Sequence, residues 1–586
     1  MVSTLLVSLF LLLALIAVPI FGSSFLAWQL GLFLLYGVAA QGVGLAWGAG
    51  GFLPLGNALF FGGGAYLSAF ALKATEGDLW INLGAMLGIA FLLGGLAFIV
   101  GMVLFRGKAG SGPSFSLVAL ALVLIFSQLA NSATGLTGGF NGFSGYQPLG
   151  NLDAFGNFYF VIVVLVVVVT LALLLVHRLP IGLLLRAMVA NEDRLALLGF
   201  APHRLKAGVF AGSAFITGLA GGLYASHQGI VTPQAIGFLL SAEFVIWAAV
   251  GGRMHPLGPL LGAVAIGWLS SELRDSVSWW ELAVACIFLV VVLLFKKGSF
   301  QIVETAINLA KRAGLVPRTA RHAVILTPPN SKAAEPISTI RFRDIHLQAG
   351  AVRILNGVTI ELVDRGVLAV IGPNGAGKST LLNALTGTLP VTGGDVFSGE
   401  IQLTNRRPHE VLSYGIGRKM QIPSIFPGLS VAENLRVASF AGRFKPWDFF
   451  MPQAMRWQSP MVRRVLAEAG VAFDTGTNDD AQILSQGTKQ VLEFLIATAA
   501  EPRVLLLDEP AAGMSPTESQ EMVRLVRAYI ELTGASIVLV EHDMKVVEAL
   551  SERVAVLHFG EVLAEGKFDE VRANPKVQDV YAGGHK

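Results

Sequence analysis

The sequence predicts an α-helical polytopic membrane domain followed by an α/β P-loop nucleotide-binding domain. Three observations lead to this fold class. Only 21 of the 81 charged residues lie in residues 1–300, and the first 72 residues carry none. A water-soluble surface cannot be built from such a stretch, so its solvent is lipid. The rest of the chain has ordinary charge density, alternates strand-like and helix-like segments, and contains a phosphate-loop pattern.

Three parts are expected along the 586 residues, because one core rarely grows past about 250–300 residues. Residues 1–300 form the membrane domain, 301–336 a basic linker and 337–586 the α/β domain. The basic side chains of the linker suit the anionic inner leaflet of a membrane. The net charge of +3 is too small to indicate nucleic acid, and the single cysteine excludes an intramolecular disulfide.

Eight to ten apolar segments are expected to cross the membrane as helices. Spanning takes about 20 residues, so the three shortest candidates could instead be re-entrant or buried in the bundle. The first candidate lacks the basic region of a secretory signal and is expected to be retained. The candidates are Val2–Ile20, Ser24–Trp47, Phe52–Leu72, Leu79–Phe105, Ser114–Leu129, Phe158–Val176, Ala207–Ala225, Ile236–Val250, Leu257–Ser270 and Leu282–Phe295.

Basic residues predict the orientation of these segments. Residues 177–206 carry five Lys or Arg side chains, and Lys296-Lys297 follows the last candidate, so we expect both on the cytoplasmic side. Residues 131–157 and 227–236 contain neither Lys nor Arg and are expected outside.

Two ionisable residues, Glu243 and Arg253, are expected at membrane depth, where charges are rare and often functional. A role in transport and a structural pairing both remain open for them. Glycine is dense in the same half of the chain, which favours close approach of helices.

Residues 180–200 differ from the apolar segments around them, because leucines alternate with charged residues such as Arg186 and Arg194. This pattern predicts an amphipathic pair of helices on the cytoplasmic side, ending at Gly199. On the pattern alone, the pair could lie on the lipid headgroups or dock into a groove of an ATPase domain.

The strongest chemical motif is Gly372-Pro373-Asn374-Gly375-Ala376-Gly377-Lys378-Ser379-Thr380, which fits G-x-x-x-x-G-K-[ST]. It follows Val367–Ile371, a predicted buried strand, and precedes Leu381–Leu385, a predicted helix start. In this context backbone N–H groups surround the β-phosphate and the helix N-terminus attracts its charge. Lys378 would reach the β- and γ-phosphates, and Ser379 would bind Mg²⁺. A chance glycine-rich turn is the alternative that this context disfavours.

Two later strands are predicted to end at the same edge of the sheet. Val504–Leu507 leads into Asp508 and Glu509, and Val538–Val540 leads to His542. We expect Asp508 to hold Mg²⁺ and Glu509 to polarise the water that attacks the γ-phosphate. His542 would hydrogen-bond the γ-phosphate, although a lone histidine or a strand-end acid is often only structural.

With these motifs in place, residues 337–586 resemble the ATP-binding cassette (ABC) ATPases. The resemblance identifies Gln421 as the Q-loop residue, Leu484–Gln490 as the signature and His542 as the switch histidine. It implies ATP and Mg²⁺ as cofactors, with Gln421 joining Ser379 and Asp508 at the metal.

The resemblance also implies that two such domains enclose ATP, with Ser485 and Gly487 of one facing the γ-phosphate held by the other. This signature departs from the family pattern, because it reads Leu-Ser-Gln-Gly-Thr instead of Leu-Ser-Gly-Gly-Gln. The aromatic residue that usually stacks on adenine is absent near Ala349.

The front half resembles the permeases of branched-chain amino acid and urea/amide importers. The residues that carry this resemblance are Leu55–Tyr66, Thr137–Gly142 and Gly218–Ala225, and residues 186–199 are similar to the coupling segment of these permeases. Docking of segment 181–199 on the ATPase domain is therefore favoured. Ile246–Arg253 and Gly415–Pro423 look closer to the urea-type members.

These resemblances imply a permease/ATPase fusion subunit of an importer for branched-chain amino acids or urea and short amides. The expected partners are a second permease and ATPase (or a second copy of this chain), a periplasmic substrate-binding protein and membrane lipid. The expected location is a bacterial inner membrane, with the ATPase domain in the cytoplasm. An exporter half-transporter, or an ATP-gated channel or sensor, is the alternative; the short loops and the number of spans disfavour export.

Overall fold

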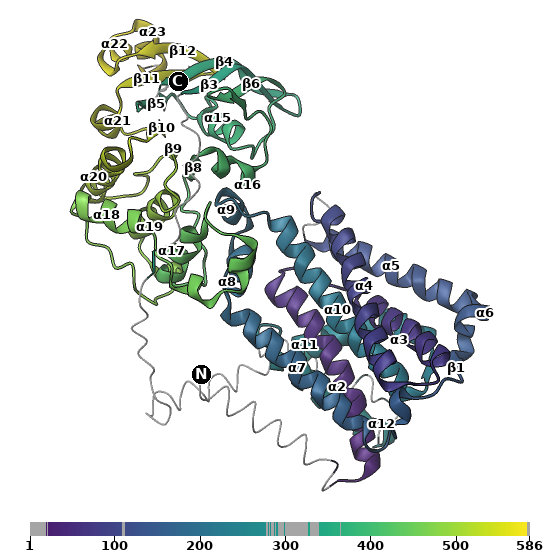
Figure 1. Cartoon of the computed structure of the whole chain (residues 1–586). Coiled ribbons are helices and arrows are strands. Elements are labelled where there is room, and N and C mark those ends of the chain that lie inside the picture. Colours follow the sequence, from purple (N-terminus) through teal and green to yellow (C-terminus); the bar gives the residue numbers. More distant parts are fainter. Residues whose placement is uncertain are drawn as a thin grey trace. The chain divides into compact units, whose positions relative to one another are not determined.

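The computed structural model describes residues 22–107, 112–276, 339–363 and 365–582, with a few isolated positions outside these ranges. The chain forms two compact units (Figure 1). The first unit comprises Met1–Arg178 and His203–His322, and the second comprises Leu179–Pro202 and Ala323–Lys586. The linker predicted at 301–336 lies almost entirely outside the described residues.

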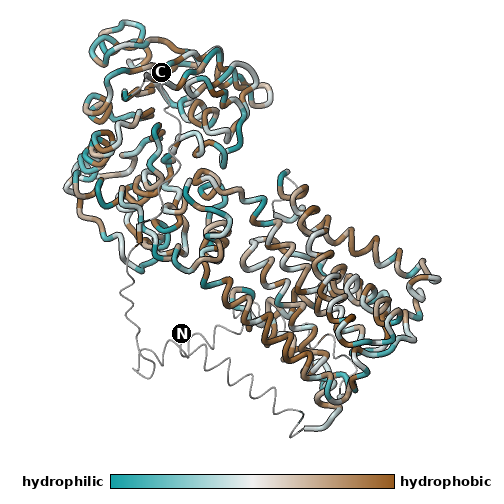
Figure 2. The backbone as a smooth tube through the Cα atoms, in the orientation of Figure 1, coloured by the Kyte–Doolittle hydropathy of each residue, from teal (hydrophilic) through white to brown (hydrophobic). Residues whose placement is uncertain are grey.

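The first unit is a bundle of helices. Its helices are mostly hydrophobic along their whole length (Figure 2), because lipid-exposed and buried faces are both apolar. Its elements are α2 (Ser24–Gly44), the π-helix η1 (Leu45–Ala49), α3 (Asn57–Ala74), α4 (Leu79–Leu104), α5 (Pro113–Ser132), α6 (Thr134–Thr137), η3 (Gly139–Asn141), β1 (Phe143–Ser144), η4 (Leu149–Asn151), α7 (Phe158–Arg178), α10 (Pro202–Gln228), β2 (Ile230–Val231), η5 (Pro233–Ile236), α11 (Phe238–Gly251) and α12 (Leu257–Ser276).

Five helices of the described residues are long and apolar enough to cross a membrane: Ser24–Ala49, Leu79–Leu104, Pro113–Ser132, Phe158–Arg178 and Pro202–Gln228. These five predicted segments are therefore helical and have the length and apolarity that a span needs. The segment predicted as a short one at 114–129 is in fact a helix of 20 residues, since Pro113 begins it and Ala130, Asn131 and Ser132 continue it.

Three further candidates form helices, α3, α11 and α12, that do not meet this criterion of length and apolarity. Val2–Ile20 and Leu282–Phe295 lie outside the described residues, apart from isolated positions. The number of eight to ten spans therefore stays a prediction.

The second unit contains a six-stranded sheet and a four-stranded antiparallel sheet. The six-stranded sheet has the order β12-β11-β5-β10-β9-β8 and is parallel except for β12. The four-stranded sheet has the order β4-β3-β6-β7. The central strands β5, β9 and β10 are buried at every residue, as expected for continuous apolar runs covered on both faces.

The strands of this unit are β3 (Thr339–Ala349), β4 (Val352–Val363), β5 (Val367–Ile371), β6 (Gly393–Ser398), β7 (Ile401–Gln402), β8 (Ile416–Lys419), β9 (Val504–Asp508), β10 (Ser536–Val540), β11 (Arg553–His558) and β12 (Glu561–Gly566). The helices are α8 (Pro180–Ala190), α9 (Glu192–Leu197), α15 (Lys378–Leu385), α16 (Pro408–Val411), η6 (Leu412–Tyr414), α17 (Val431–Phe440), η7 (Pro446–Phe450), η8 (Pro452–Arg456), α18 (Pro460–Ala469), η9 (Ala481–Ile483), α19 (Gln486–Thr498), α20 (Pro516–Thr533), α21 (Met544–Leu550), α22 (Phe568–Arg572) and α23 (Pro575–Ala582).

Helices α8 and α9 belong to the second unit although the sequence around them belongs to the first (Figure 1). Sequence analysis includes this segment in a membrane domain of residues 1–300. Its packing is different, because residues 179–202 contact α16 and α17 of the second unit. The docking that the amphipathic pattern and the resemblance favour is thus observed, and the alternative of a helix on lipid headgroups is not.

Candidate functional site

Gly372–Thr380 forms a tight loop between β5 and α15. Three glycines of this loop have positive φ angles, 148° at Gly372, 82° at Gly375 and 98° at Gly377. Residues that carry a side chain rarely adopt this backbone conformation. The N-terminus of α15 begins at Lys378, so its free backbone N–H groups form an anion-binding position. The strand and helix predicted around this motif are therefore confirmed.

Lys378 is held against this loop. Its Nζ donates hydrogen bonds to the carbonyl oxygens of Gly372 at 2.8 Å and Pro373 at 2.9 Å. Burial lowers its pKa, and the nearby charges of Glu509 and Asp508 act in the opposite direction. A bound phosphate would give the Lys378 ammonium group negatively charged oxygens as partners in place of these two carbonyl oxygens.

Ser379 and Asp508 meet across the sheet edge. The Ser379 hydroxyl donates to Asp508 Oδ1 at 3.1 Å, and Asp508 is 2% exposed. The other carboxylate oxygen, Oδ2, lies 3.2 Å from the Arg418 guanidinium. The hydroxyl and the carboxylate are oxygen ligands of the kind that Mg²⁺ prefers, so these residues fit the metal that the sequence predicts.

No group of three or more His, Cys, Asp or Glu side chains that could hold a metal occurs among the described residues. Mg²⁺ in nucleotide sites is usually bound through one or two protein oxygens together with substrate phosphates and water.

Glu509 and His542 are brought together as the sequence predicts. They follow β9 and β10, which are neighbours in the parallel sheet, and His542 Nε2 lies 2.9 Å from Glu509 Oε1. Glu509 has a positive φ of 45°, so the chain turns sharply directly after Asp508. Its side chain is 15% exposed, which leaves it partly open to solvent beside the phosphate loop.

Glu541 fixes the two loops that carry these residues. Its buried carboxylate accepts hydrogen bonds from the backbone N–H groups of Ala511 at 3.1 Å, His542 at 2.9 Å and Asp543 at 3.3 Å. Burial raises its pKa, although these three bonds oppose the rise.

The residues expected in the Q-loop and the signature lie apart from this centre. Gln421 is exposed, and the described residues include no hydrogen bond from its side chain to Ser379 or Asp508. Ser485 is exposed at the N-cap of α19, where its hydroxyl accepts from the Thr488 N–H. A Cβ on Gly487 would lie 2.2 Å from Glu518 Oε1, so a side chain at this position would require the Glu518 carboxylate to move.

The docked segment, residues 179–202, contacts Arg418 and Glu493 through Arg194 on α9. This side chain is 1% exposed, and its Nη1 donates to the carbonyl oxygen of Arg418 at 2.7 Å. Nη1 also lies 3.7 Å from Glu493 Oε1 on α19, the helix that begins at the signature. Burial lowers the pKa of Arg194, and the charge of Glu493 opposes that effect.

Glu493 connects three parts of the second unit. It is fully buried, accepts from the Met420 N–H at 2.8 Å and forms a 3.7 Å ion pair with Lys419. Met420 directly precedes Gln421, so one carboxylate contacts the docked segment, the Q-loop strand and the signature helix. Burial raises its pKa, while the charges of Lys419 and Arg194 lower it.

Two further contacts hold the docked segment. Arg186 on α8 forms a 2.7 Å ion pair with Glu433 on α17, and both side chains are partly exposed. Asn191 donates from Nδ2 to Ser424 Oγ at 3.0 Å and to the Ile425 carbonyl at 3.1 Å. Charged and polar bonds therefore fix the segment at several points along its length.

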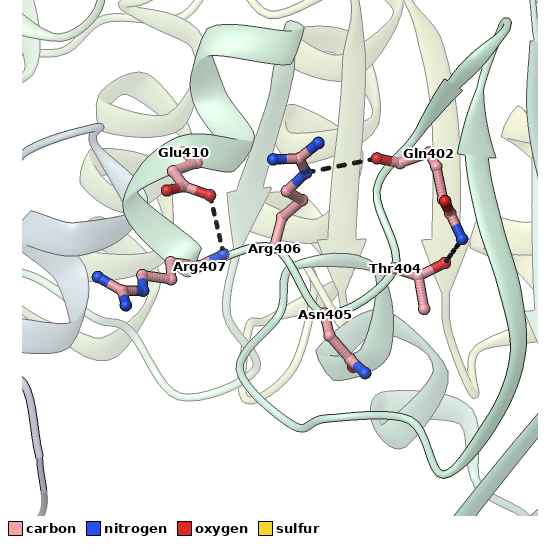
Figure 3. Close-up of a pocket in the computed structure, with 6 residues that line it drawn as sticks. All are labelled: Gln402, Thr404, Asn405, Arg406, Arg407 and Glu410. Atoms are coloured by element: carbon pink, nitrogen blue, oxygen red, sulfur yellow. Dashed lines mark hydrogen bonds between the residues drawn. The ribbon is translucent and has the colours of Figure 1, made fainter.

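A separate polar pocket of about 400 Å³ lies between β7 and α16 (Figure 3). It is lined by Gln402, Thr404, Asn405, Arg406, Arg407 and Glu410. Arg406 Nε donates to the Gln402 carbonyl at 3.4 Å, and Glu410 accepts from the Arg407 N–H at 3.3 Å. These polar groups bond to one another, and none of the lining residues belongs to the phosphate loop.

Comparison with known proteins agrees with both halves of this architecture. Residues 25–294 match the family described as branched-chain amino acid transport system / permease component. Residues 355–512 match the ABC transporter family, and 561–584 match the branched-chain amino acid ATP-binding cassette transporter family.

Individual relatives cover the second half of the chain. The high-affinity branched-chain amino acid transport ATP-binding protein LivG of Salmonella typhimurium is 34% identical over 248 residues, which cover 40% of this chain and 94% of that protein. The chain belongs to the branched-chain amino acid family of ABC importers. BraF of Pseudomonas aeruginosa, another such ATP-binding protein, is 32% identical over the same shares. A nucleotide-free ATP-binding cassette from an ABC transporter is 27% identical, with a TM-score of 0.36, over 41% of this chain and 98% of that one.

Membership in this family means that the importer subunit hydrolyses ATP through its second unit and that this hydrolysis is coupled to transport. It is a membrane protein that works in a complex with other transporter subunits. Permease and ATPase, the parts that the two family matches describe, are joined here in one chain. The family membership leaves the exporter alternative without support.

Four charged residues of the importer were not assigned roles from the sequence: Arg418, Lys419, Glu493 and Glu541. A signal exists for two of them, because Arg418 and Lys419 end a four-residue strand in which every position is buried. Adjacent basic residues at buried strand positions indicate buried acidic partners. The identity of those partners, Asp508 and Glu493, depends on contacts between distant parts of the chain.

Proposed function

We propose that this chain is the fused permease and ATPase subunit of an importer that takes up branched-chain amino acids. The observation that carries the proposal is the docking of residues 179–202 of the permease sequence on the ATPase unit through Arg186, Asn191 and Arg194. The names of the relatives, all branched-chain amino acid transport proteins, support the substrate class. Urea and short amides, which the sequence also allows, have no such support.

Hydrolysis depends on groups at the carboxyl ends of β5, β9 and β10. Lys378 and the N-terminus of α15 bind the phosphates, and Glu509 accepts a proton from the attacking water. His542, 2.9 Å from Glu509, holds that carboxylate in place and donates toward the γ-phosphate. Arg418 keeps the Asp508 carboxylate oriented toward Ser379.

Mg²⁺ would be held by Ser379 and Asp508. When bound, it neutralises charge that develops on the phosphate oxygens. Gln421 would join these ligands only after its loop moves inward, because its side chain is exposed in the structure.

The exposed signature implies a second ATPase domain. Ser485 and the N-terminus of α19 offer hydrogen-bond donors to solvent and would bind the γ-phosphate held by that partner. The partner is a second permease with its ATPase, or a second copy of this chain. A periplasmic protein would deliver the amino acid, and the second unit would face the cytoplasm of a bacterial inner membrane.

Movement of the second unit would be transmitted through α8 and α9. Closure of two ATPase domains on ATP displaces each docked segment, and the membrane halves then change from outward to inward access. Hydrolysis with Glu509 as the base resets them.

The test is ATP-dependent accumulation of labelled L-leucine and labelled urea in vesicles that contain the complete complex and its binding protein. We expect leucine to accumulate and urea to be excluded. The Glu509→Gln variant should bind ATP but lose substrate-stimulated hydrolysis. Accumulation of urea alone would overturn the substrate class, and near-normal turnover of Glu509→Gln would overturn the role of that carboxylate.

A further inference from the structure

The first unit contains a cavity of about 410 Å³ that the transport cycle described above does not use. This volume is within the range of about 300–1,000 Å³ that small-molecule sites occupy. Polar and aromatic side chains line it, among them Tyr36, Ser127, Asn131, Tyr224, Gln234 and Glu243. They come from α2, α5, α10, η5 and α11, which are distant in sequence, so the fold assembles this cavity.

The location of the cavity agrees with a substrate path. Asn131 and Gln234 lie in the two segments, 131–157 and 227–236, that the charge pattern predicts on the external side. Tyr36 and Glu243 lie within α2 and α11. The lining therefore extends from predicted external loops into helices of the bundle.

Of the described residues that line the cavity, Glu243 is the one acid, and none is Lys or Arg. Among the described residues its carboxylate has no hydrogen bond and no ion pair within 4.0 Å, although Arg274 on α12 acts on it electrostatically. Arg253, the other ionisable residue singled out in this half of the chain, lies over the Trp47 ring at 4.3 Å. A carboxylate that lines a cavity and has no ion pair within 4.0 Å among the described residues points to a ligand of opposite charge.

Two tyrosine rings complete the environment of this carboxylate. Tyr36 stacks with Tyr224 at 6.0 Å between centroids and with Trp247 at 5.3 Å. Neighbouring rings of Phe61 and Phe244 hold Tyr36 on its other sides, so its position is fixed by packing.

We propose that Glu243 binds the ammonium group of an amino acid in the membrane half of the importer, in the part of the cavity that Tyr36 and Tyr224 also line. The carboxylate supplies the opposite charge and accepts hydrogen bonds from the ammonium group. Since no Lys or Arg is among the described residues that line the cavity, the amino acid carboxylate would accept hydrogen bonds from neutral groups such as Ser127, Asn131 and Gln234. This assignment rests on the proposed function only for the choice of an amino acid over another primary amine.

The site predicts a ranking of simple probes. L-Leucine and 3-methylbutylamine both carry an ammonium group, whereas 4-methylpentanoate carries only the carboxylate. We expect the first two to bind the full chain in lipid nanodiscs and the third to bind at least tenfold more weakly. Saturation-transfer NMR measures such binding even at millimolar dissociation constants.

Variants test the residue itself. Glu243→Gln should weaken binding of both ammonium probes at least tenfold, so that they bind no more tightly than 4-methylpentanoate. Glu243→Asp, which keeps the carboxylate, should restore part of the lost affinity. Glu272→Gln, an exposed acid on α12, is the matched control and should leave binding unchanged. A thermal melt of each variant shows that it is folded, and Glu243→Asp provides the test if Glu243→Gln does not fold.

The outcomes separate this inference from the proposed function. Binding of 3-methylbutylamine that depends on Glu243, with no binding of leucine, would support the ammonium site and contradict amino acid uptake. Equal binding of the ammonium probes to wild type and Glu243→Gln, or no binding of either probe to wild type, would overturn the site. Leucine uptake by the complete complex would then still support the proposed function.

Discussion

The Arg418 guanidinium lies 3.2 Å from the Asp508 carboxylate, and both residues are almost completely buried. The same guanidinium donates to Asn383 Oδ1 at 2.7 Å and Thr386 Oγ1 at 2.9 Å at the end of α15. Its backbone carbonyl accepts from Arg194 of the docked segment. One residue therefore contacts the proposed metal carboxylate, the helix after the phosphate loop and the segment that would transmit movement.

Replacement of Arg418 by Met should lower ATP turnover by about tenfold to a hundredfold. The reason is that a hydrogen bond to a charged group contributes about 1.5–3 kcal/mol, and each 1.4 kcal/mol is a factor of ten. Asp508 would also be left as a buried charge without its partner, which is strongly destabilising. Turnover per folded molecule, measured in the assembled complex, checks this prediction.

The matched control for this variant is Arg443→Met. Arg443 is also buried and pairs with Glu501 at 2.6 Å, but it contacts neither the phosphate loop nor the docked segment. It should lower the melting temperature and leave turnover per folded molecule nearly unchanged. Equal loss of turnover in both variants would show that Arg418 acts only through general stability.

Replacement of Arg194 by Lys should lower leucine uptake much more than ATP hydrolysis. A single ammonium group cannot reproduce the fork that reaches both the Arg418 carbonyl and Glu493. Arg186→Ala is the control, because the Arg186–Glu433 pair is partly exposed and such pairs contribute only about 0–1 kcal/mol. The ratio of leucine transported to ATP hydrolysed should fall in Arg194→Lys and not in Arg186→Ala.

Much of the second unit could be predicted from the sequence, because its central strands are continuous apolar runs bounded by glycine and acidic residues. Val367–Ile371 was predicted with both of its ends, and the convergence of Ser379, Asp508, Glu509 and His542 follows from parallel strands that end at one edge. These are local patterns combined with one rule of sheet geometry. They do not depend on the choice of side-chain partners.

The ionic contacts of Arg194, Arg418 and Glu493 could not be predicted in the same way. Arg194 and Arg418 are 224 positions apart along the chain, and Arg418 and Glu493 are 75 positions apart. From the sequence alone, each of these charged residues could equally lie on a solvated surface or be buried. The amphipathic segment at 180–200 was similarly ambiguous, because a lipid surface and a protein groove both require one apolar face. The three-dimensional contacts decide between these possibilities.

Glu541 should make ATP hydrolysis sensitive to acid. Burial raises its pKa above the ordinary value of 4.5, so on acidification it gains a proton at a higher pH than an exposed glutamate. The protonated Glu541 carboxyl group accepts hydrogen bonds from the N–H groups of Ala511, His542 and Asp543 more weakly than the carboxylate does. The loops that hold Glu509 and His542 then become looser. We therefore expect turnover to fall while the pH is still above 4.5.

Glu541→Gln provides the comparison for this pH dependence. The variant should be less active at neutral pH, because a neutral amide replaces the charged acceptor, and its activity should change less on acidification. Turnover of both proteins from pH 8 to pH 5 measures the difference. Parallel pH profiles would show that another group causes the loss in acid.

Gly221 marks a close crossing of α3 and α10 in the first unit. A Cβ at this position would lie 1.9 Å from the Phe61 carbonyl oxygen, and one at Gly64 on α3 would lie 2.1 Å from the Gly218 carbonyl oxygen. These contacts involve backbone atoms, so the helices would have to separate. Gly221→Ala should therefore destabilise the bundle by about 1–3 kcal/mol, the usual cost of overpacking.

Gly208→Ala, on the same helix, should have the opposite effect on the stability of the bundle. No heavy atom lies within 4 Å of a Cβ built at Gly208, so alanine adds helix propensity of up to about 1 kcal/mol without a clash. Thermal unfolding of the two variants in one lipid gives the comparison. A loss of stability in Gly221→Ala beside an unchanged or higher stability in Gly208→Ala would show that the glycines of the membrane half serve close helix packing, because only the position of the added methyl group differs.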